Sequence, residues 1–338
     1  SNDALLLSEV STISNINGQL FVAAIVGNYS GIAPLDPRLN DSDGDGWIDG
    51  FELKLNTDPT NPNDTFACNG YSILCTRNFD DVVYPATHNS HANPESGFNN
   101  IAENQLANIS TQLERGIRYI NMDVYDYNDE VWVCHGDWDL LIHPCLQSGG
   151  ERAQNQLEEV AAFLEDNPYE VVTLAFENYV DANTMYGEFN NSDLSRYLFS
   201  KQEVWPTLGE MVFANTRLVV MADSENQGYD WWLDEHDETR MTAFSYQSDS
   251  EFDCENSRGN GSASMLQIAH YITDPISSEA DAQLVNQFAS LWRHAQLCLE
   301  EHGMLPNYIL VDYADYGDVV LVAAVLNGVE EAPEGAFT

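Results

Sequence analysis

Two histidines and several oxygen-bearing side chains follow apolar runs of this sequence, at or near the points where the runs end. The set is His88, Asn89, Asn121, Asp123, His135 and Glu177. Amide and carboxylate oxygens are the ligands that hard cations prefer, so the two asparagines, the aspartate and the glutamate predict a calcium site rather than a zinc site. Two histidines beside a cation supply acid–base groups, and this combination suits phosphoryl transfer.

The elements that must position these residues alternate between strand and helix. Strands are expected over residues 81–86, 117–124, 131–133, 170–177, 217–222 and 308–311, and helices over residues 103–115, 151–166, 280–301 and 318–326. Repeated strand–helix units predict an α/β fold, namely a TIM-like (β/α) barrel of regular or irregular form. The chemistry of such barrels lies at the carboxyl ends of the strands. The residues expected there are His88, Asp123, His135, Glu177, Asp223 and Asp312.

Strand periodicity refines this picture for the strand at 117–124. Residues two apart in a strand share a face, so Asn121 and Asp123 should point together into the mouth of the barrel. Arg118 should lie on the opposite face, where an ion pair outside the barrel is more plausible than catalysis. Asp312 has two competing interpretations, as a partner of a catalytic histidine or as a helix cap.

The charge balance of the chain argues against nucleic acid as a partner. The chain has 12 Lys and Arg residues against 55 Asp and Glu residues, a formal net charge of −43. Such a field repels nucleic acid and anionic membrane surfaces. Solubility in a salty environment is its plain explanation, and calcium binding accounts for part of it. No apolar run approaches the roughly 18–20 residues of a membrane span.

Six cysteines indicate an exported protein with three disulfides. Fifteen connectivities are possible in principle. The local pairs Cys68–Cys75 and Cys134–Cys145 have the lowest cost of loop closure, which leaves Cys254–Cys298. We therefore expect a secreted, extracellular or periplasmic protein. Because the sequence opens on no recognisable signal peptide, we expect a mature or trimmed chain.

A second calcium site is predicted near the amino terminus, in residues 41–52. This stretch fits the twelve-residue EF-hand loop, with Gly46 at the sharp turn. The predicted ligands are Asp41, Asp43, Asp45, Trp47 through its carbonyl, Asp49 and Glu52. The residues that follow resemble a thrombospondin type 3 repeat of bacterial proteins. A single loop without a paired partner is more consistent with a structural clip than with a sensor.

These patterns divide the chain into three parts. Residues 1–35 contain short apolar runs that are compatible with strands or helices, and their role is open. Residues 36–65 form the EF-hand-like or thrombospondin type 3-like segment. Residues 66–338 form the barrel. We expect a monomer.

The ordered motifs of the third part resemble the X-domain of phosphatidylinositol-specific phospholipase C, over roughly residues 75–328. They are Thr87-His88-Asn89-Ser90, Gly116-Ile117-Arg118 with Asp123-Val124-Tyr125-Asp126, Val133-Cys134-His135-Gly136, and Val172 to Asn178. The metal-free bacterial branch of this family has an arginine at the position of Asp123. The aspartate therefore favours the calcium-dependent branch.

The resemblance implies a reaction and a set of roles. An inositol 2-hydroxyl would attack the phosphodiester, releasing diacylglycerol and a cyclic inositol phosphate. His88 would contact the phosphate and assist proton transfer, and His135 would protonate the leaving oxygen. Asn121 stands where the calcium-dependent branch usually has glutamate. It can bind a cation but cannot act as a base, so the resemblance leaves Glu177 or His88 to take the proton.

Two other functions remain compatible with the sequence. One is a glycerophosphodiesterase or sphingomyelinase D-like enzyme on the same barrel, and the other is a catalytically weak, calcium-stabilised binding module. Three aromatic features also have two interpretations each. The pair Trp231-Trp232 suits a transient membrane-contact loop or ordinary burial, and Tyr125 and Trp138 suit the pocket or the core. The other six histidines are interpreted as surface or structural residues.

Overall fold

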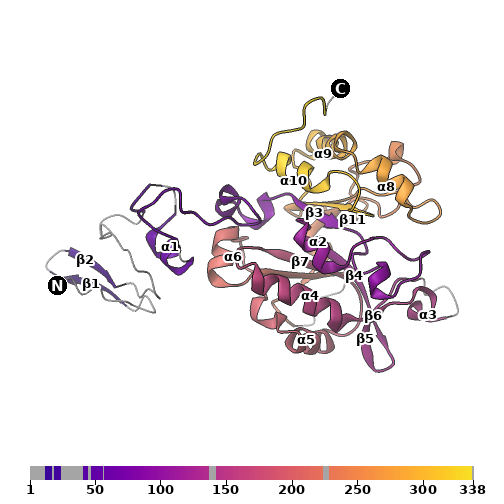
Figure 1. Cartoon of the computed structure of the whole chain (residues 1–338), viewed down its shortest axis with the longest axis horizontal. Helices are drawn as coiled ribbons and strands as arrows, with labels where there is room; N and C mark the ends of the chain where they lie inside the picture. The colour runs from indigo at the N-terminus through magenta and orange to yellow at the C-terminus, as the bar shows by residue number, and fades with distance from the viewer. Residues whose placement is uncertain are drawn as a thin grey trace.

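The computed structural model describes residues 12–16, 19–23, 41–44, 47–55, 57–136, 142–223 and 228–336. Within these ranges the chain forms a curled sheet covered by helices on its outer side (Figure 1). The strands are β1 Thr12–Ile16, β2 Gln19–Ala23, β3 Tyr84–Thr87, β4 Tyr119–Tyr127, β5 Glu130–Val133, β6 Glu151–Arg152, β7 Val172–Tyr179, β8 Leu218–Ala222, β9 Trp232–Asp234, β10 Thr239–Met241, β11 Arg258–Gly259, β12 Met265–Ala269 and β13 Tyr308–Val311. The α-helices are α1 Asp49–Leu55, α2 Ile109–Glu114, α3 Pro144–Ser148, α4 Ala153–Asp166, α5 Ala182–Asn191, α6 Leu208–Ala214, α7 Glu235–Glu238, α8 Glu279–Val285, α9 Phe288–His302 and α10 Val319–Leu326.

The predicted α/β class and TIM-like barrel are confirmed, in an irregular form. The sheet runs in the order β11-β10-β12-β13-β3-β4-β7-β8-β9, and all neighbours from β10 to β9 are parallel. Among the described residues no ladder joins β9 to β11, so the barrel is open there. Figure 1 shows α4 and α5 on one side of the barrel and α8, α9 and α10 on the other.

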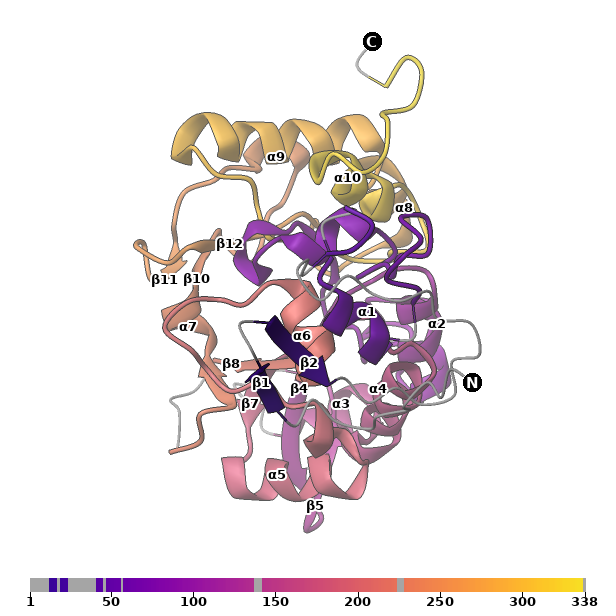
Figure 2. The same ribbon diagram turned by 90° about the vertical axis from the view of Figure 1, so that its left-hand side faces the viewer.

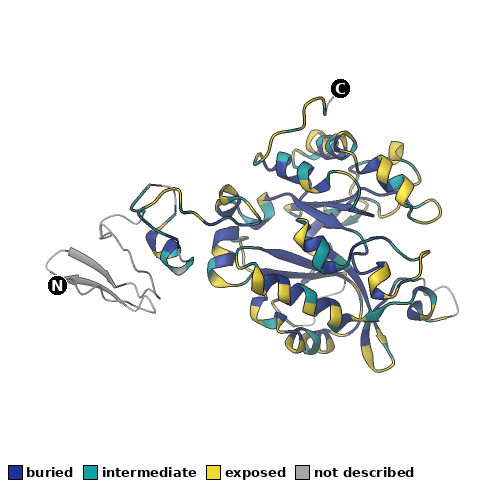
Figure 3. Ribbon diagram, in the orientation of Figure 1, coloured by how far each residue is buried: buried dark blue, intermediate teal, exposed yellow. Residues whose placement is uncertain are grey.

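The burial of the barrel strands agrees with the apolar runs of their sequence. Strands β3, β8, β12 and β13 are buried along their whole length, as expected where helices cover one face and the barrel interior the other (Figure 3). Helix α4 turns Leu157, Val160 and Leu164 towards the sheet, the face that its sequence period predicted. Strands β9, β10 and β12 were not predicted, although residues 265–269 read as an apolar run.

Three predicted elements differ from the structure. The strand before His135 is not a barrel strand, because β5 pairs antiparallel with β4 as a hairpin. Asn128 and Asp129 have positive φ angles of 57° and 62°, which make the tight turn that such a hairpin needs. His135 therefore does not follow a parallel barrel strand, and this part of the prediction was wrong.

The other two differences concern helices that are shorter than predicted. Only residues 109–114 of the expected helix at 103–115 are helical, because Asn108 accepts a hydrogen bond from the Thr111 amide and starts α2 there. The expected helix at 280–301 breaks between α8 and α9. At the break the Asn286 side chain donates to the Asp312 carbonyl at 2.8 Å, a tertiary contact that local periodicity does not reveal.

The amino end of the barrel is closed by the segment before β3 and by α6. Phe79, Trp205 and Leu208 lie in one buried cluster with residues of the barrel interior. Helix α1 packs beside α6, as Figures 1 and 2 both show, with the Phe51 and Phe213 ring centres 4.1 Å apart. The segment of the predicted EF-hand-like loop thus contacts the end of the barrel opposite to His88.

The three predicted disulfides, Cys68–Cys75, Cys134–Cys145 and Cys254–Cys298, are all present. Strands β1 and β2 form an antiparallel hairpin, while the rest of residues 1–35 lies outside the described residues. The predicted boundaries of the three parts stay predictions. Within the described ranges, no helix has the length and apolar character needed to cross a membrane.

Candidate active site

The ends of β3 and β4 are joined by hydrogen bonds that fix the first group of predicted residues. The backbone amide of Asn89 donates to Asn121 Oδ1 at 3.0 Å, and the Asn121 amide donates to Ser90 Oγ at 2.9 Å. Asn89 has a positive φ of 42°, a conformation that asparagine tolerates better than most residues. This turn brings His88 and Asn89 from β3 next to Asn121 from β4.

His88 is held by the end of the last strand. Its Nδ1 lies 2.8 Å from Asp312 Oδ1, and its ring stacks on Tyr271 with centres 4.1 Å apart and planes 3° apart. The Asp312 carboxylate also accepts hydrogen bonds from Asn104 and Ser277. Of the two interpretations of Asp312, the structure supports the histidine partner.

His135 reaches the same site from the loop after β5. Its Nδ1 lies 3.0 Å from the Ala102 carbonyl oxygen, and its Nε2 lies 3.2 Å from Nδ2 of Asn89. Its backbone amide donates to Ser148 Oγ at 3.0 Å. Burial lowers the pKa of His135, although the bond to the Ala102 carbonyl opposes this shift. The neutral imidazole is therefore the resting form near neutral pH.

The carboxylates gather on the adjoining strands β4, β7 and β8. Asp123 is buried, and its Oδ1 has no hydrogen-bond partner among the residues that the structure describes. Desolvation raises the pKa of Asp123 well above its usual range, and the charges of Glu177 and Asp223 raise it further. A hydroxyl group of Tyr179 donates to Glu177, and the Asn178 amide donates to Asp223.

This arrangement fits a hard cation. A buried carboxylate oxygen without a donor, beside other carboxylates that raise its pKa, is stabilised when a positive ion neutralises the group. Asp123 and Glu177 offer carboxylate oxygens, and Asn89 and Asn121 offer amide oxygens. All four are oxygen ligands of the kind that calcium takes.

A cavity of about 350 Å³ opens over this site. Its walls include His88, Asn121, Phe176, Glu177, Asp223, Glu235, His236, Phe244, Arg258, Gln267, Tyr271 and Leu310. His135 borders a second hollow with Ile101 and Gln147. Sequence reasoning did not single out Glu235 or Tyr271. The apolar run before Tyr271 was the available signal for the last of these.

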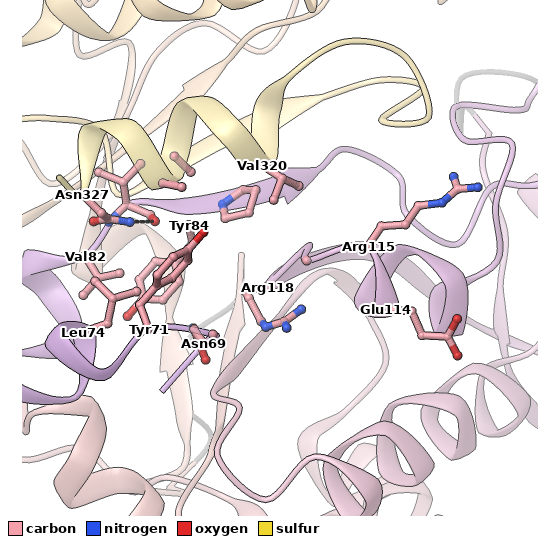
Figure 4. Close-up of a pocket in the computed structure, with 16 residues that line it drawn as sticks. Asn69, Tyr71, Leu74, Val82, Tyr84, Glu114, Arg115, Arg118, Val320 and Asn327 are labelled. Carbon is pink, nitrogen blue, oxygen red and sulfur yellow. Dashed lines mark hydrogen bonds between the residues drawn. The ribbon is translucent and has the colours of Figure 1, made fainter. Parts of the chain in front are cut away.

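A further cavity lies far from these residues. Figure 4 shows it between the start of β3, the end of α2 and α10, with Tyr84, Arg118 and Val320 in its walls. It therefore lies at the amino ends of the strands, opposite to His88. Arg118 donates from Nε to Glu170 at 2.7 Å, so the predicted ion pair outside the barrel is confirmed.

The amino-terminal loop is described in part. The amide and hydroxyl of Ser42 each donate to the Asp49 carboxylate at 2.7 Å, and the Gly44 amide donates to Asp41 Oδ1 at 2.6 Å. Glu52 is fully buried on α1. Asp45 and Gly46 lie outside the described residues. Calcium binding by the loop stays a prediction.

Two predictions about aromatic and histidine residues can be settled. Trp231 and Trp232 are 7% and 0% exposed, so they do not form a membrane-contact loop. They pack against Phe189 and Phe176 in the core. His91 is fully buried with Nε2 3.0 Å from the Cys134 carbonyl, and burial lowers its pKa to about 3. Trp138 lies outside the described residues.

The chain is similar to several known proteins. The family described as PI-PLC X 1 matches residues 74–327. An uncharacterized secreted protein of Arthroderma benhamiae is 31% identical over 300 residues, covering 79% of this chain and 65% of the relative. A PI-PLC X domain-containing protein of Arabidopsis thaliana is 30% identical, covering 76% of this chain and 64% of the relative. The chain thus spans less than two thirds of either relative.

Solved structures show the same fold. A structure of the phosphatidylinositol-specific phospholipase C of Staphylococcus aureus aligns with a TM-score of 0.53 at 12% identity, covering 74% of this chain and 93% of that one. At this identity the likeness concerns the fold alone.

Proposed function

The chain belongs to the PI-PLC X family, and from this membership and the geometry of its site we propose that it is a calcium-dependent phosphodiesterase of the phosphatidylinositol-specific phospholipase C type. Its substrate would be phosphatidylinositol or a related inositol phosphodiester. The inositol 2-hydroxyl oxygen forms a new bond to phosphorus, and the bond from phosphorus to the glycerol oxygen breaks. The products are diacylglycerol and a cyclic inositol phosphate.

The observation that carries the proposal is the convergence of two histidines on one asparagine. Asn89 follows His88 directly, and its Nδ2 lies 3.2 Å from His135 Nε2. Its backbone amide is also bonded to Asn121, two residues before the buried Asp123. We infer that a phosphate beside Asn89 would lie near both imidazoles and near the predicted oxygen ligands.

His88 is the proposed proton acceptor for the attacking hydroxyl. When Nδ1 donates to Asp312, the other nitrogen carries the lone pair that a base needs. The Asp312 carboxylate also stabilises the imidazolium that forms. Glu177, which the resemblance offers as an alternative acceptor, is assigned here to the cation, because its charge is among those that raise the pKa of Asp123.

His135 is the proposed proton donor to the leaving glycerol oxygen. With Nδ1 donating to the Ala102 carbonyl, only Nε2 is available to exchange a proton with substrate. Burial keeps this imidazole neutral in the free protein. A bound phosphodiester anion raises the pKa of a neighbouring imidazole, so substrate itself would favour the protonated form.

Calcium would be held by Asn89, Asn121, Asp123 and Glu177. When bound there, it supplies positive charge that stabilises the phosphate oxygens and lowers the pKa of a nearby hydroxyl. The side-chain amide of Asn89 donates to Asn104 Oδ1 at 3.3 Å, an orientation that leaves its oxygen available as a ligand. A second calcium ion in the loop at residues 41–52 would act as a clip, since α1 packs beside α6 at the other end of the barrel.

The proposed location of the protein rests on its disulfides, its net charge and one relative. Three disulfides and the net charge of −43 support an extracellular or periplasmic location, and the Arthroderma relative is a secreted protein. Exposed Ile101 lines the hollow that His135 borders, and exposed Ile142 and Leu146 lie just before and on α3, whose Gln147 lines the same hollow. These side chains would meet the lipid part of the substrate in transient contact with a membrane. We propose that the protein acts as a monomer.

Phosphorus NMR of the products tests this function. The full chain is incubated with phosphatidylinositol in mixed micelles, first with calcium and then with chelator. The expected signal is a cyclic inositol phosphate that forms only with calcium, while circular dichroism verifies that the protein stays folded in chelator. A noncyclic product would favour a glycerophosphodiesterase or sphingomyelinase D-like enzyme, and glycan or lipid binding without turnover would favour the binding module.

A further inference from the structure

The peptide bond between Cys134 and His135 has both of its polar groups held by side chains. Its carbonyl oxygen lies 3.0 Å from Nε2 of His91, and its amide donates to Ser148 Oγ at 3.0 Å. His91 and Ser148 are both buried, so water competes little for either contact. The orientation of this peptide sets the direction in which the His135 side chain leaves the backbone.

The end of the β4–β5 hairpin explains why the Cys134 carbonyl needs such a donor. The paired residues of β5 end at Val133, and the Cys134 amide still donates to the Asp123 carbonyl at 3.3 Å. Cys134 itself is fully buried. A buried carbonyl without a donor is unfavourable, so the group must find one where the backbone ladder ends. The imidazole of His91 supplies it.

His91 is placed by the turn that follows β3. The amide of the preceding Ser90 donates to the Asn121 carbonyl at 2.8 Å, which joins the turn to β4. The His91 carbonyl accepts a hydrogen bond from Gln156 Nε2 at 3.2 Å. The His91 ring also packs edge-on against Phe98, with ring centres 5.3 Å apart. The backbone and the packing therefore hold this imidazole independently of its contact with Cys134.

The second contact of His135 leads back to the same turn. His135 Nδ1 lies 3.0 Å from the Ala102 carbonyl oxygen, and two residues later the Asn104 amide donates to the Ala92 carbonyl at 2.9 Å. The turn at His91 and Ala92 thus holds both the peptide that carries His135 and the loop that contacts its ring. Both contacts leave Nε2 of His135 facing the site.

The tautomer of His91 follows from its partner. A carbonyl oxygen only accepts hydrogen bonds, so the proton is on Nε2. Asp123 Oδ2 is 4.0 Å from the same nitrogen, beyond hydrogen-bond distance, so the bond goes to the Cys134 carbonyl. His91 is not among the residues that line either hollow of the site. It can therefore act on substrate only through other residues.

We propose that His91 is a positioning residue that aims Nε2 of His135 at the leaving oxygen of the substrate. This inference rests on the proposed function and adds to it a residue that does not touch substrate. The disulfide Cys134–Cys145 holds the Cys134 side chain but does not fix the rotation of the peptide that follows. The bond from His91 fixes that rotation. Because proton transfer needs donor and acceptor at hydrogen-bond distance, a displacement of about 1 Å slows this step.

Two substrates with different leaving groups test the inference. Phosphatidylinositol releases an alcohol that needs a proton, whereas an inositol phosphate ester of p-nitrophenol releases a group that leaves without one. His91→Leu, which lacks the donor, should lower kcat on phosphatidylinositol about 10- to 100-fold with little change in KM, and leave the rate on the nitrophenyl ester nearly unchanged. His91→Gln, whose amide can donate to the same carbonyl, should recover most of the lost kcat.

His294→Leu is the matched control. His294 is also buried, and its Nε2 lies 2.8 Å from the Asp253 carbonyl oxygen, on α9 and away from the lining of the cavity. This variant loses a bond of the same kind, so it should keep the ratio of the two rates. The inference is overturned if His91→Leu slows both substrates equally or slows neither. It is also overturned if His91→Gln is as slow as His91→Leu on phosphatidylinositol.

Nitrogen NMR of the imidazoles tests the inference even if His91→Leu does not fold. In the unmodified protein, the His91 resonances should be those of the neutral ring with its proton on Nε2, the tautomer that donates to Cys134. The opposite tautomer overturns the inference, because Nε2 would then have no proton to donate. If the unmodified protein forms no cyclic product, the proposed function is rejected, and the tautomer of His91 still decides whether this side chain holds the peptide.

Discussion

The Nδ1 atom of His88 lies 2.8 Å from Oδ1 of Asp312, the residue that directly follows the last strand of the barrel. Asn104 donates to the same oxygen at 3.0 Å, and the Ser277 hydroxyl donates to the other oxygen. The Asn286 side chain also holds the Asp312 carbonyl. The carboxylate is thus fixed before substrate binds, and it sets which nitrogen of His88 carries the proton.

The first prediction concerns Asp312→Asn. An amide can donate to Nδ1 and so favours the tautomer in which Nε2 keeps the proton, which is wrong for a base. We expect kcat to fall roughly 10²–10⁴-fold, the usual contribution of acid–base catalysis, with little change in KM. Steady-state kinetics on phosphatidylinositol micelles measure both. Asp129→Asn in the β4–β5 turn is the control, and equal activities of the two variants would contradict the assigned role.

A second prediction separates the two histidines. If His135 protonates the leaving oxygen, His135→Gln should lose much less activity on an inositol phosphate ester of p-nitrophenol, since that group leaves without a proton. His88→Gln should lose activity on both substrates, because the attacking hydroxyl is the same. Rates on phosphatidylinositol and on the nitrophenyl ester give the comparison. Similar losses of His135→Gln on both substrates would remove the proton-donor assignment.

The third prediction concerns calcium at the barrel site. Replacing Asp123 by Asn removes a carboxylate from a set with only two, Asp123 and Glu177, so calcium affinity should fall by at least about tenfold. Terbium luminescence and calcium titration in the Asp41→Asn background isolate the barrel site from the amino-terminal loop. Asp126→Asn, beyond the site on the same strand, is the matched control. Unchanged calcium affinity in Asp123→Asn would exclude Asp123 as a ligand.

Much of the fold was accessible from sequence because its strands are buried on both faces. The run at residues 308–311 coincides with β13, and the helix expected at 151–166 differs from α4 only at its start. The break between α8 and α9 was not accessible from the local sequence. Helix α9 starts at Phe288 because Asn286 bonds to Asp312, and such contacts join residues far apart in the chain.

The candidate site likewise contains residues that local sequence patterns located and residues that they did not. His88 and Asn89 stand directly after an apolar run, so local pattern located them. Tyr271 follows the apolar run at residues 265–269 and Arg258 lies in the two-residue strand β11, and their places in the site depend on what they face. Tyr271 is defined by its stacking on His88, and Arg258 by the absence, among the described residues, of an acceptor for its buried Nε. Neither property can be inferred from the residues that are adjacent in the sequence.

The last prediction concerns stability at acid pH, through two buried histidines behind the site. His270 Nδ1 lies 2.9 Å from His294 Nδ1, and each Nε2 contacts a backbone carbonyl oxygen. Burial lowers the pKa of His270 to about 3 and that of His294 to about 4. Below about pH 6.5 the unfolded chain gains protons on these residues that the folded chain does not. Their contribution to the free energy of unfolding therefore falls as the pH falls from about 6.5 towards 4.

The variant His270→Gln should lower by one the number of extra protons that the unfolded chain binds relative to the folded chain. Between pH 6.5 and 4.5, its free energy of unfolding should depend on pH less steeply than that of the unmodified protein, by up to about 1.4 kcal/mol per pH unit. Urea unfolding followed by tryptophan fluorescence at several pH values measures both slopes. Gln287→Ala, at the exposed start of α9, changes no titratable group and should keep the slope of the unmodified protein. A His270→Gln slope equal to that of the control would mean that His270 takes up its proton in the folded state.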